Sequence, residues 1–246
     1  MDRLRHLFSM VWIGVCATAM LEQSRMLQGR PADLSWLEVY VFCGTVFGYH
    51  FTHPDKLYRI LAWLMVIPAG LGYWFTSLPW WVMLTPALGW VAYYGFEKNG
   101  KTGLRSGIWA KPIAVGITWA WVTVVLPLYP DNPATYLFLF LERTLFIIAL
   151  ALAYDLSDAE YDRAQGFGTL ALTMGKRQTF RLIYCCLAAS GIMAFAQGYS
   201  MGHTLAIGLT LLWAALWLPW ILSKPSWHAW HKPLIDGVMV FWCLSV

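Results

Sequence analysis

Three aspartates around position 158 carry the residue spacing in this sequence that most strongly suggests chemistry. Asp155, Asp158 and Asp162 lie at positions i, i+3 and i+7, so they share one face if a single helix carries all three. Neighbouring carboxylates repel one another unless a cation lies among them. Carboxylate oxygens suit Mg²⁺ or Ca²⁺ better than a soft metal. The spacing therefore suggests a site for a hard divalent cation, although a solvated acidic helix has the same pattern.

The residues after these aspartates predict that the chain turns back on itself. Arg163 adds a positive charge next to Asp162, and Gly166 and Gly168 allow a tight turn before the next apolar segment.

Further upstream, Glu142 and Arg143 interrupt an apolar segment, where a charged residue normally faces a partner in the interior. One of them could orient a substrate, or the two could be structural.

The composition indicates a membrane protein with several spans. The chain has 246 residues, of which 59% are hydrophobic and 12% charged, whereas about 25% charged is usual for a soluble domain. The 16 Trp of the chain are typical of a membrane protein, in which indole rings lie at the two membrane interfaces and in the bundle interior. The net charge of +4 is modest, and no nucleic-acid partner is expected. We interpret the first apolar run as a retained span rather than a cleaved signal peptide.

Apolar segments of membrane-spanning length set the predicted architecture. We expect an all-α polytopic bundle, with about nine transmembrane helices around a central cavity open to the cytoplasmic face, forming one domain over residues 1–246. Its oligomeric state is left open. The nine predicted spans cover residues 7–23, 34–53, 57–76, 79–96, 109–129, 134–155, 180–198, 203–222 and 233–246.

The basic residues predict the orientation of these spans. With nine spans, Arg25 and Arg30 lie on one side, and all the other basic residues except Arg143 fall on or near the other side. The positive-inside rule then places the N-terminus and the aspartate-rich stretch in the cytoplasm. We predict an integral protein of a bacterial cytoplasmic membrane, with its polar chemistry at the inner face.

One set of residues at fixed distances carries a family resemblance: Asp155, Asp158, Asp162, Arg163, Gly166, Thr169, Leu170 and Gly175. This stretch resembles the second aspartate-rich motif of the UbiA-type intramembrane prenyltransferases, and the nine-span topology is similar to theirs. Tyr94-x-x-x-Lys98 resembles a shorter element that contacts the diphosphate in some members. The resemblance implies that the three aspartates are catalytic and hold Mg²⁺. It also implies that Arg163, Tyr94 and Lys98 contact the substrate phosphates.

The sequence departs from the family where a first aspartate-rich motif is expected. Thr52, His53 and Lys56 stand in place of an asparagine and two aspartates, and Asp55 is one position out of register. One hypothesis is that Lys56, with a protonated His53, replaces one metal ion by a fixed positive charge at the substrate. The other is that the chain keeps the fold and has lost prenyl transfer.

The implied activity is Mg²⁺-dependent transfer of an isoprenyl group from an isoprenyl diphosphate to an aromatic or other lipophilic acceptor. Metal and basic side chains would neutralise the departing diphosphate, and aromatic faces would stabilise the allylic cation. The alternatives are a terpene cyclase of the same fold, a catalytically silent protein that binds an isoprenoid lipid or a partner, and a small transporter. Neither the chain length of the isoprenoid nor the acceptor follows from the sequence.

Overall fold

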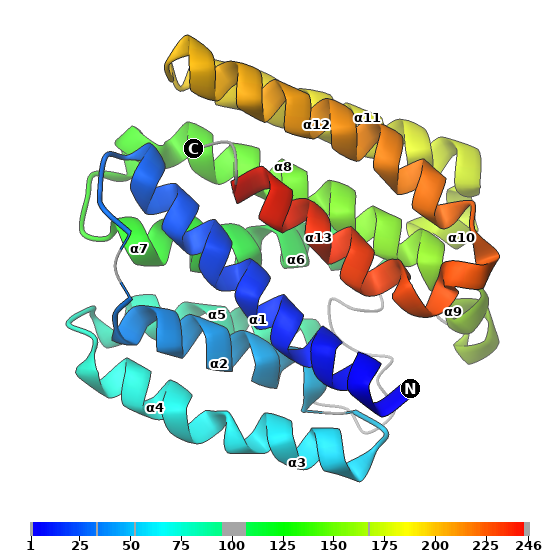
Figure 1. Cartoon of the computed structure of the whole chain (residues 1–246), viewed down its shortest axis with the longest axis horizontal. Coiled ribbons are helices and arrows are strands. Elements are labelled where there is room, and N and C mark those ends of the chain that lie inside the picture. Colours follow the sequence, from blue (N-terminus) through cyan, green and yellow to red (C-terminus); the bar gives the residue numbers. More distant parts are fainter. Residues whose placement is uncertain (1, 33, 52, 95–106, 167, 244–246) are drawn as a thin grey trace.

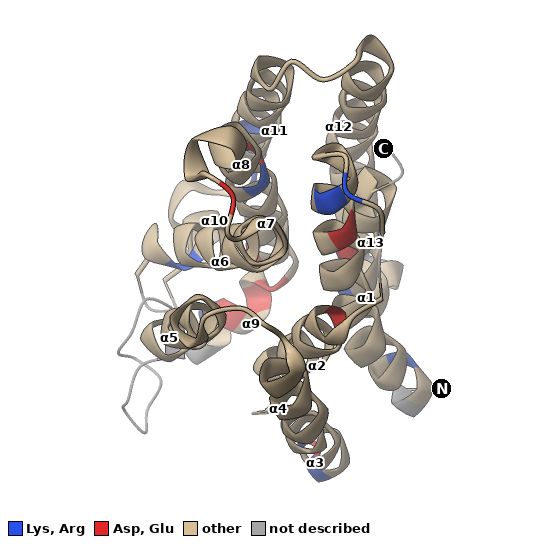
Figure 2. Cartoon of the chain, turned by 90° about the vertical axis from the view of Figure 1, so that its left-hand side faces the viewer, with Lys and Arg blue, Asp and Glu red and all other residues tan. Residues whose placement is uncertain are grey.

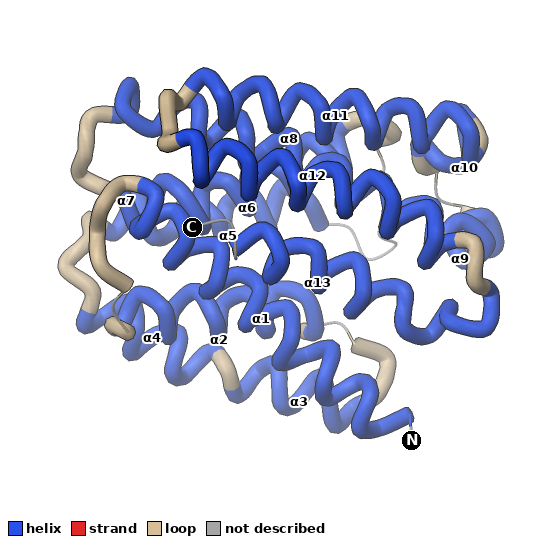
Figure 3. The backbone as a smooth tube through the Cα atoms, turned by 45° about the horizontal axis from the view of Figure 1, so that its top comes forward, coloured by secondary structure: helices blue, strands red, loops and turns tan. Residues whose placement is uncertain are grey.

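The computed structural model of the chain describes residues 2–32, 34–51, 53–94, 107–166 and 168–243. Within these ranges every regular element is a helix and no strand occurs (Figure 3). This confirms the predicted all-α class. Successive long helices run in opposite directions, so the loops between them gather at two ends of the bundle (Figure 1).

The helices coincide with the predicted apolar segments to within a few residues. The first half contains α1 (Asp2–Leu27), α2 (Trp36–His50), α3 (Lys56–Leu64), α4 (Val66–Phe75) and α5 (Trp80–Tyr94). The middle contains α6 (Ala110–Ala120), the π-helical turn η2 (Trp121–Val125), α7 (Leu126–Leu128) and α8 (Pro133–Ser157). The last part contains α9 (Ala159–Gln165), α10 (Leu170–Met174), α11 (Lys176–Ala196), α12 (Met201–Leu222), the 3-10 helix η3 (Pro225–Trp230) and α13 (His231–Cys243).

Six helical segments in the described part of the chain are long and apolar enough to cross a membrane. The helices α2 and α5 have 15 residues each and α13 has 13, all shorter than the roughly 20 residues that a typical bilayer requires. The predicted count of nine spans is therefore not confirmed. The six candidates are Leu4–Leu27, Lys56–Phe75, Ala110–Leu128, Pro133–Ser157, Lys176–Ala196 and Met201–Leu222.

The outer surface of α12 shows why this bundle suits a lipid environment. Leu205, Leu209, Leu212 and Leu216 follow one another along one face of the helix and are 60%, 67%, 58% and 68% exposed. A soluble monomer rarely exposes such a continuous apolar surface. Figure 2 shows that charged residues occupy only short parts of the ribbon over the described ranges. We infer that the chain is an integral membrane protein.

The centre of the bundle is α8, which packs most extensively against α11 and α6 and also contacts α13. Gly116 of α6 allows its close approach to α8, because a Cβ there would lie 2.8 Å from the carbonyl oxygen of Thr144. Gly72 plays the same part between α4 and α2, where a Cβ would lie 2.7 Å from the carbonyl oxygen of Trp36. Small residues at these two contacts fix the helix spacing around the interior.

The two ends of the bundle differ in their polar residues. The N-terminus, the turn between α2 and α3, α9 and α10 lie toward the right of Figure 1, and the loops that precede α2, α5, α8 and α12 lie toward the left. At the left end, Arg25 pairs with Glu38 at 2.7 Å and Arg30 pairs with Asp131 at 2.6 Å. The right end carries the aspartate-rich stretch, so the candidate site lies there.

Candidate functional site

The aspartate-rich stretch is divided between two helices. The helix α8 ends at Ser157, and α9 begins after Asp158, whose backbone angles of φ −95° and ψ 5° are not helical. The sequence suggested one shared helical face if a single helix ran through all three aspartates, and the structure corrects this. The backbone turns at the middle aspartate, so the three side chains leave the backbone in directions that a straight helix does not predict.

Asp155, the first of these aspartates, lies in the interior beside a lysine. Its side chain is 1% exposed and accepts a hydrogen bond through Oδ1 from the ammonium of Lys111, in the first turn of α6. Its other oxygen, Oδ2, is buried and has no hydrogen-bond partner among the described residues. A buried carboxylate oxygen without a donor costs free energy, so it is a favourable place for a bound cation.

Asp158 points to a different lysine, on α13. The ammonium of Lys232 lies 2.9 Å from Asp158 Oδ2, and the two side chains are 53% and 26% exposed. Asp162 is buried on α9 and close enough to interact electrostatically with both Asp155 and Lys111. The structure therefore brings Asp155, Asp162 and Lys111 into one neighbourhood, while Asp158 lies at its more exposed side.

A magnesium ion could be held by two of these carboxylates. Within the described ranges, no three His, Cys, Asp or Glu side chains form a group arranged to hold a metal. Mg²⁺ in phosphate-transfer sites is commonly held by one or two carboxylates together with substrate phosphates and water. The buried Oδ2 of Asp155 suits this role, and Asp162 is the nearest second candidate. The Mg²⁺ site thus stays a prediction.

The other site residues predicted from the sequence, apart from His53, lie either on the exposed surface or, at least in their side chains, outside the described part of the chain. Arg163 is exposed on α9, and Lys56 is exposed in the first turn of α3, where the described residues give it no ion pair. Tyr94 is the last residue of α5, and its side chain lies outside the described part, as does the whole of Lys98. The ion pairs at this end thus involve two lysines that the sequence did not single out.

His53 is not suited to carry the positive charge that the sequence suggested for it. Its Nδ1 accepts a hydrogen bond from the backbone N–H of Asp55 at 3.1 Å, which requires an unprotonated nitrogen. Partial burial lowers the pKa of His53 below its ordinary value, and the nearby His6 acts in the same direction. At neutral pH this side chain is uncharged, so only Lys56 of the proposed pair supplies a fixed charge.

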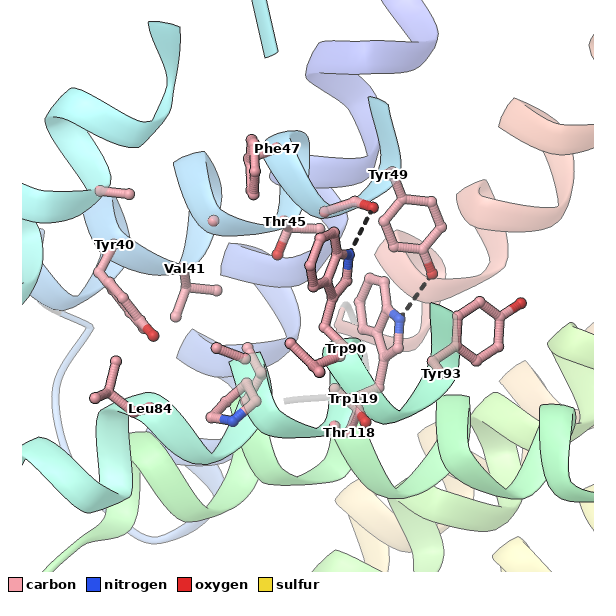
Figure 4. Close-up of a pocket in the computed structure, with 18 of the residues that line it drawn as sticks. Tyr40, Val41, Thr45, Phe47, Tyr49, Leu84, Trp90, Tyr93, Thr118 and Trp119 are labelled. Atoms are coloured by element: carbon pink, nitrogen blue, oxygen red, sulfur yellow. Dashed lines mark hydrogen bonds between the residues drawn. The ribbon is translucent and has the colours of Figure 1, made fainter. Parts of the chain in front are cut away.

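A cavity of about 550 Å³ lies between α2, α4, α5, α6 and η2. Drug-sized ligand sites in proteins enclose roughly 300 to 1,000 Å³, so this cavity can hold a ligand of that size. Two hydrogen bonds fix aromatic rings along its wall: the indole of Trp119 donates to the Tyr49 hydroxyl at 2.9 Å, and that of Trp90 donates to the carbonyl of Gly48 at 3.2 Å (Figure 4). The wall is largely apolar and rich in aromatic side chains.

The helix α6 connects this cavity with the aspartates. Ala114, Val115 and Thr118 of α6 line the cavity, and Lys111 precedes them by three, four and seven positions, which places it on the same helical face. Tyr93 of α5 also lines the cavity and interacts electrostatically with Lys111. One face of α6 therefore carries a cationic group at its start and an apolar cavity wall further along.

Glu142 and Arg143 form a separate structural cluster. Both are fully buried, and neither lines the cavity. Arg143 donates a hydrogen bond to Gln23 Oε1 of α1 at 2.6 Å, and Glu142 accepts one from Gln197 Nε2 at 3.4 Å. These contacts join α8 to its neighbours and support the structural alternative that the sequence left open.

Sequence reasoning missed the role of Lys111 in this site. It counted the residue only as one of many basic residues on the cytoplasmic side. The signal was its position inside the predicted span 109–129, since a charge within an apolar segment normally has an interior partner. Asp236 gave the same signal inside the last predicted span, and its carboxylate accepts a hydrogen bond from the Tyr154 hydroxyl of α8.

Comparison with known proteins gives a match by structure. By sequence, the chain matches no protein-family model and no curated protein. By structure, it is similar to a solved digeranylgeranylglyceryl phosphate synthase studied in membranes, with a TM-score of 0.56 and 11% sequence identity. The match covers 100% of this chain and 97% of that chain. The two chains share a fold. The resemblance predicted from the aspartate-rich stretch is thus supported at the level of the whole fold.

Proposed function

We propose that this chain is an intramembrane prenyltransferase, which moves an isoprenyl group from an isoprenyl diphosphate to an aromatic or other lipophilic acceptor. The observation that carries the proposal is the face of α6, where Lys111, the partner of Asp155, lies about one helical turn before residues that line a cavity of about 550 Å³. The charged end suits a diphosphate and the apolar wall suits an isoprenoid chain. The fold shared with digeranylgeranylglyceryl phosphate synthase supports the same function.

The proposed reaction would use both the charged end of α6 and the apolar cavity wall. The bond between the allylic carbon and the diphosphate oxygen breaks, and its electron pair leaves with the diphosphate. Mg²⁺ bound at Asp155 and Asp162 would supply positive charge to that leaving group. The rings of Trp90, Trp119 and Tyr49 would stabilise the allylic cation and exclude water until the acceptor attacks and passes a proton to the departed diphosphate.

The proposed placement in the membrane has nine crossings with the site at the cytoplasmic face. The six long segments are supplemented by α2, α5 and α13, whose shortness is compatible with a bundle that is thinner locally. The positive-inside rule favours a cytoplasmic location for the end that holds the aspartates. The partners are then the bilayer, a diphosphate from the cytoplasmic side and an acceptor that enters from lipid or cytoplasm.

The test is release of diphosphate by the purified chain in lipid nanodiscs. Allylic diphosphates of 10, 15 and 20 carbons would be supplied with Mg²⁺ and a panel of aromatic and glyceryl phosphate acceptors. We expect prenylated product and a loss of activity by about 100-fold or more in Asp155→Asn, since it removes charge stabilisation of the leaving group. Glu160→Gln, an exposed acidic residue on α9, is the matched control.

A catalytically silent protein with this fold is the second candidate. It is favoured by one observation, that Asp155 and Asp158 are each already paired with a lysine. In that case the chain would bind isoprenoid lipid without releasing diphosphate under any of these conditions. A cyclase would release diphosphate without an acceptor and yield a cyclic hydrocarbon or alcohol, so product analysis separates all three.

A further inference from the structure

We propose that Lys111 is a diphosphate-binding residue that exchanges partners, held by Asp155 in the free protein and turning to a phosphate oxygen when substrate binds. This inference deepens the function proposed above and rests on it. When the diphosphate arrives, Lys111 would move away from the Asp155 carboxylate, and a divalent cation could then bind to that carboxylate. The chain would thus supply a cation of its own, although it lacks the first aspartate-rich motif of the family that it resembles.

The position of Lys111 supports a role toward substrate. Its side chain is 21% exposed, whereas that of Lys232, in the other ion pair of this stretch, is 53% exposed. It lies on the helical face that further along lines the cavity at Ala114 and Val115. A diphosphate attached to a chain inside the cavity would therefore come close to this ammonium.

The carboxylate of Asp155 is arranged to accept a second cation. Lys111 engages Oδ1, and the buried Oδ2 has no hydrogen-bond donor among the residues described. Asp162, which is also close to Lys111, adds a second negative charge to the neighbourhood. Lys111 therefore lies close to two carboxylates. A divalent cation at the buried Oδ2 of Asp155 would add positive charge to this acidic neighbourhood.

The chemistry of lysine allows such an exchange. Its charge is a compact point at the end of a flexible four-carbon stem, so the ammonium can move by several ångströms without any shift of α6. Phosphate oxygens are strong acceptors for it. Each charge keeps an opposite charge beside it in the exchange, because a metal ion replaces the lysine at Asp155 while the lysine meets the added negative charge of the diphosphate. No buried carboxylate is left without a cation.

A purely structural ion pair is the competing explanation, and binding measurements separate the two. Lys111→Gln removes the competitor of the metal at Asp155, so Mn²⁺ alone, followed by its electron paramagnetic resonance signal, should bind more tightly by about threefold or more. Inorganic diphosphate, followed by calorimetry, should bind about tenfold or more weakly, as expected for the loss of a charge-assisted hydrogen bond. The affinity for Mn²⁺ should therefore rise while the affinity for diphosphate falls. A purely structural ion pair does not predict opposite changes in these two affinities.

Control variants keep the test valid if Lys111→Gln folds poorly. Lys224→Gln, which removes an equal charge from an exposed position at the same end, should change neither affinity by more than about twofold. Asp155→Asn releases Lys111 and should bind metal-free inorganic diphosphate at least as tightly as wild type. The double variant Lys111→Gln/Asp155→Asn, in which both members of the ion pair are uncharged, should bind it about tenfold more weakly than Asp155→Asn.

Equal affinity of Asp155→Asn and the double variant for diphosphate would overturn the exchange, as would a loss of Mn²⁺ affinity in well-folded Lys111→Gln. These measurements need no turnover. A wild-type protein that transfers prenyl groups but shows neither effect would keep the proposed function and lose this inference. A protein that shows both effects but releases no diphosphate from any allylic substrate would instead disprove prenyl transfer and retain the exchange.

Discussion

The indole N–H of Trp119 donates a hydrogen bond to the hydroxyl of Tyr49 at 2.9 Å, joining α6 to α2 beside the cavity (Figure 4). The two rings also meet edge to face, with centroids 6.3 Å apart and planes at 75°. Both residues line the cavity. This contact fixes the cavity wall near the end of α6, and the first prediction concerns the volume that such contacts keep open.

Gly44→Leu should fill the cavity from the side of α2. Gly44 lines the cavity, and a Cβ at this position would meet nothing within 4 Å, so the added side chain enters open space. We expect the protein to fold and the kcat/KM for a 20-carbon diphosphate to fall by about tenfold or more, since small displacements of substrate are costly. Gly208→Leu on α12, where a Cβ also meets nothing within 4 Å, is the matched control. Equal activity of both variants would place the isoprenoid elsewhere.

Gly116→Ala should destabilise the bundle at the contact between α6 and α8. The new methyl group would lie 2.8 Å from Thr144 O and from Ile148 Cγ1, so α6 must move away from α8. Overpacking of this kind costs about 1 to 3 kcal/mol. Unfolding in detergent, followed by circular dichroism, measures it. Gly208→Ala makes the same chemical change in open space and should be neutral or slightly stabilising.

The stability of the protein should fall as the pH drops below the ordinary His53 pKa of 6.5. Burial lowers the pKa of His53 in the folded chain, so the unfolded chain binds the proton first and gains stability relative to the fold as the pH decreases. His53→Gln should therefore show a smaller loss of melting temperature than wild type between pH 7 and about pH 5. His203→Gln keeps His53 and should therefore lose as much melting temperature through protonation of His53 as wild type does. An unchanged pH response of the melting temperature in His53→Gln would refute this account.

Single cysteines should report opposite sides of the membrane for the two ends of the bundle. Ser77 lies exposed between α4 and α5, and Ser226 lies exposed in η3. In a variant with the five native cysteines replaced, an impermeant maleimide added to intact cells should label Ser77→Cys but not Ser226→Cys. Labelling of Ser226→Cys should require permeabilised cells. The reverse pattern would move the aspartates to the outer face and contradict the positive-inside prediction.

Much of the fold was predictable because helix formation in a membrane depends on local sequence. Long apolar runs must satisfy their backbone hydrogen bonds internally, so each predicted span is helical over most of its described residues, although the span 57–76 is divided between α3 and α4. The turn at Gly166, with φ of 72°, was also predictable, because a glycine tolerates the left-handed region. The aspartate-rich stretch itself identified the region of the candidate site.

The sequence by itself thus determined the helical class, the approximate helix ends and the location of the acidic residues, since each follows from a few neighbouring residues. Only the tertiary structure decided that α8 stops before Asp158, that Lys111 pairs with Asp155 and Lys232 with Asp158, and that a cavity opens beside α6. Many basic residues could have reached those carboxylates. Which ones do depends on how helices distant in the sequence pack, and close approaches such as that at Gly116 set this packing.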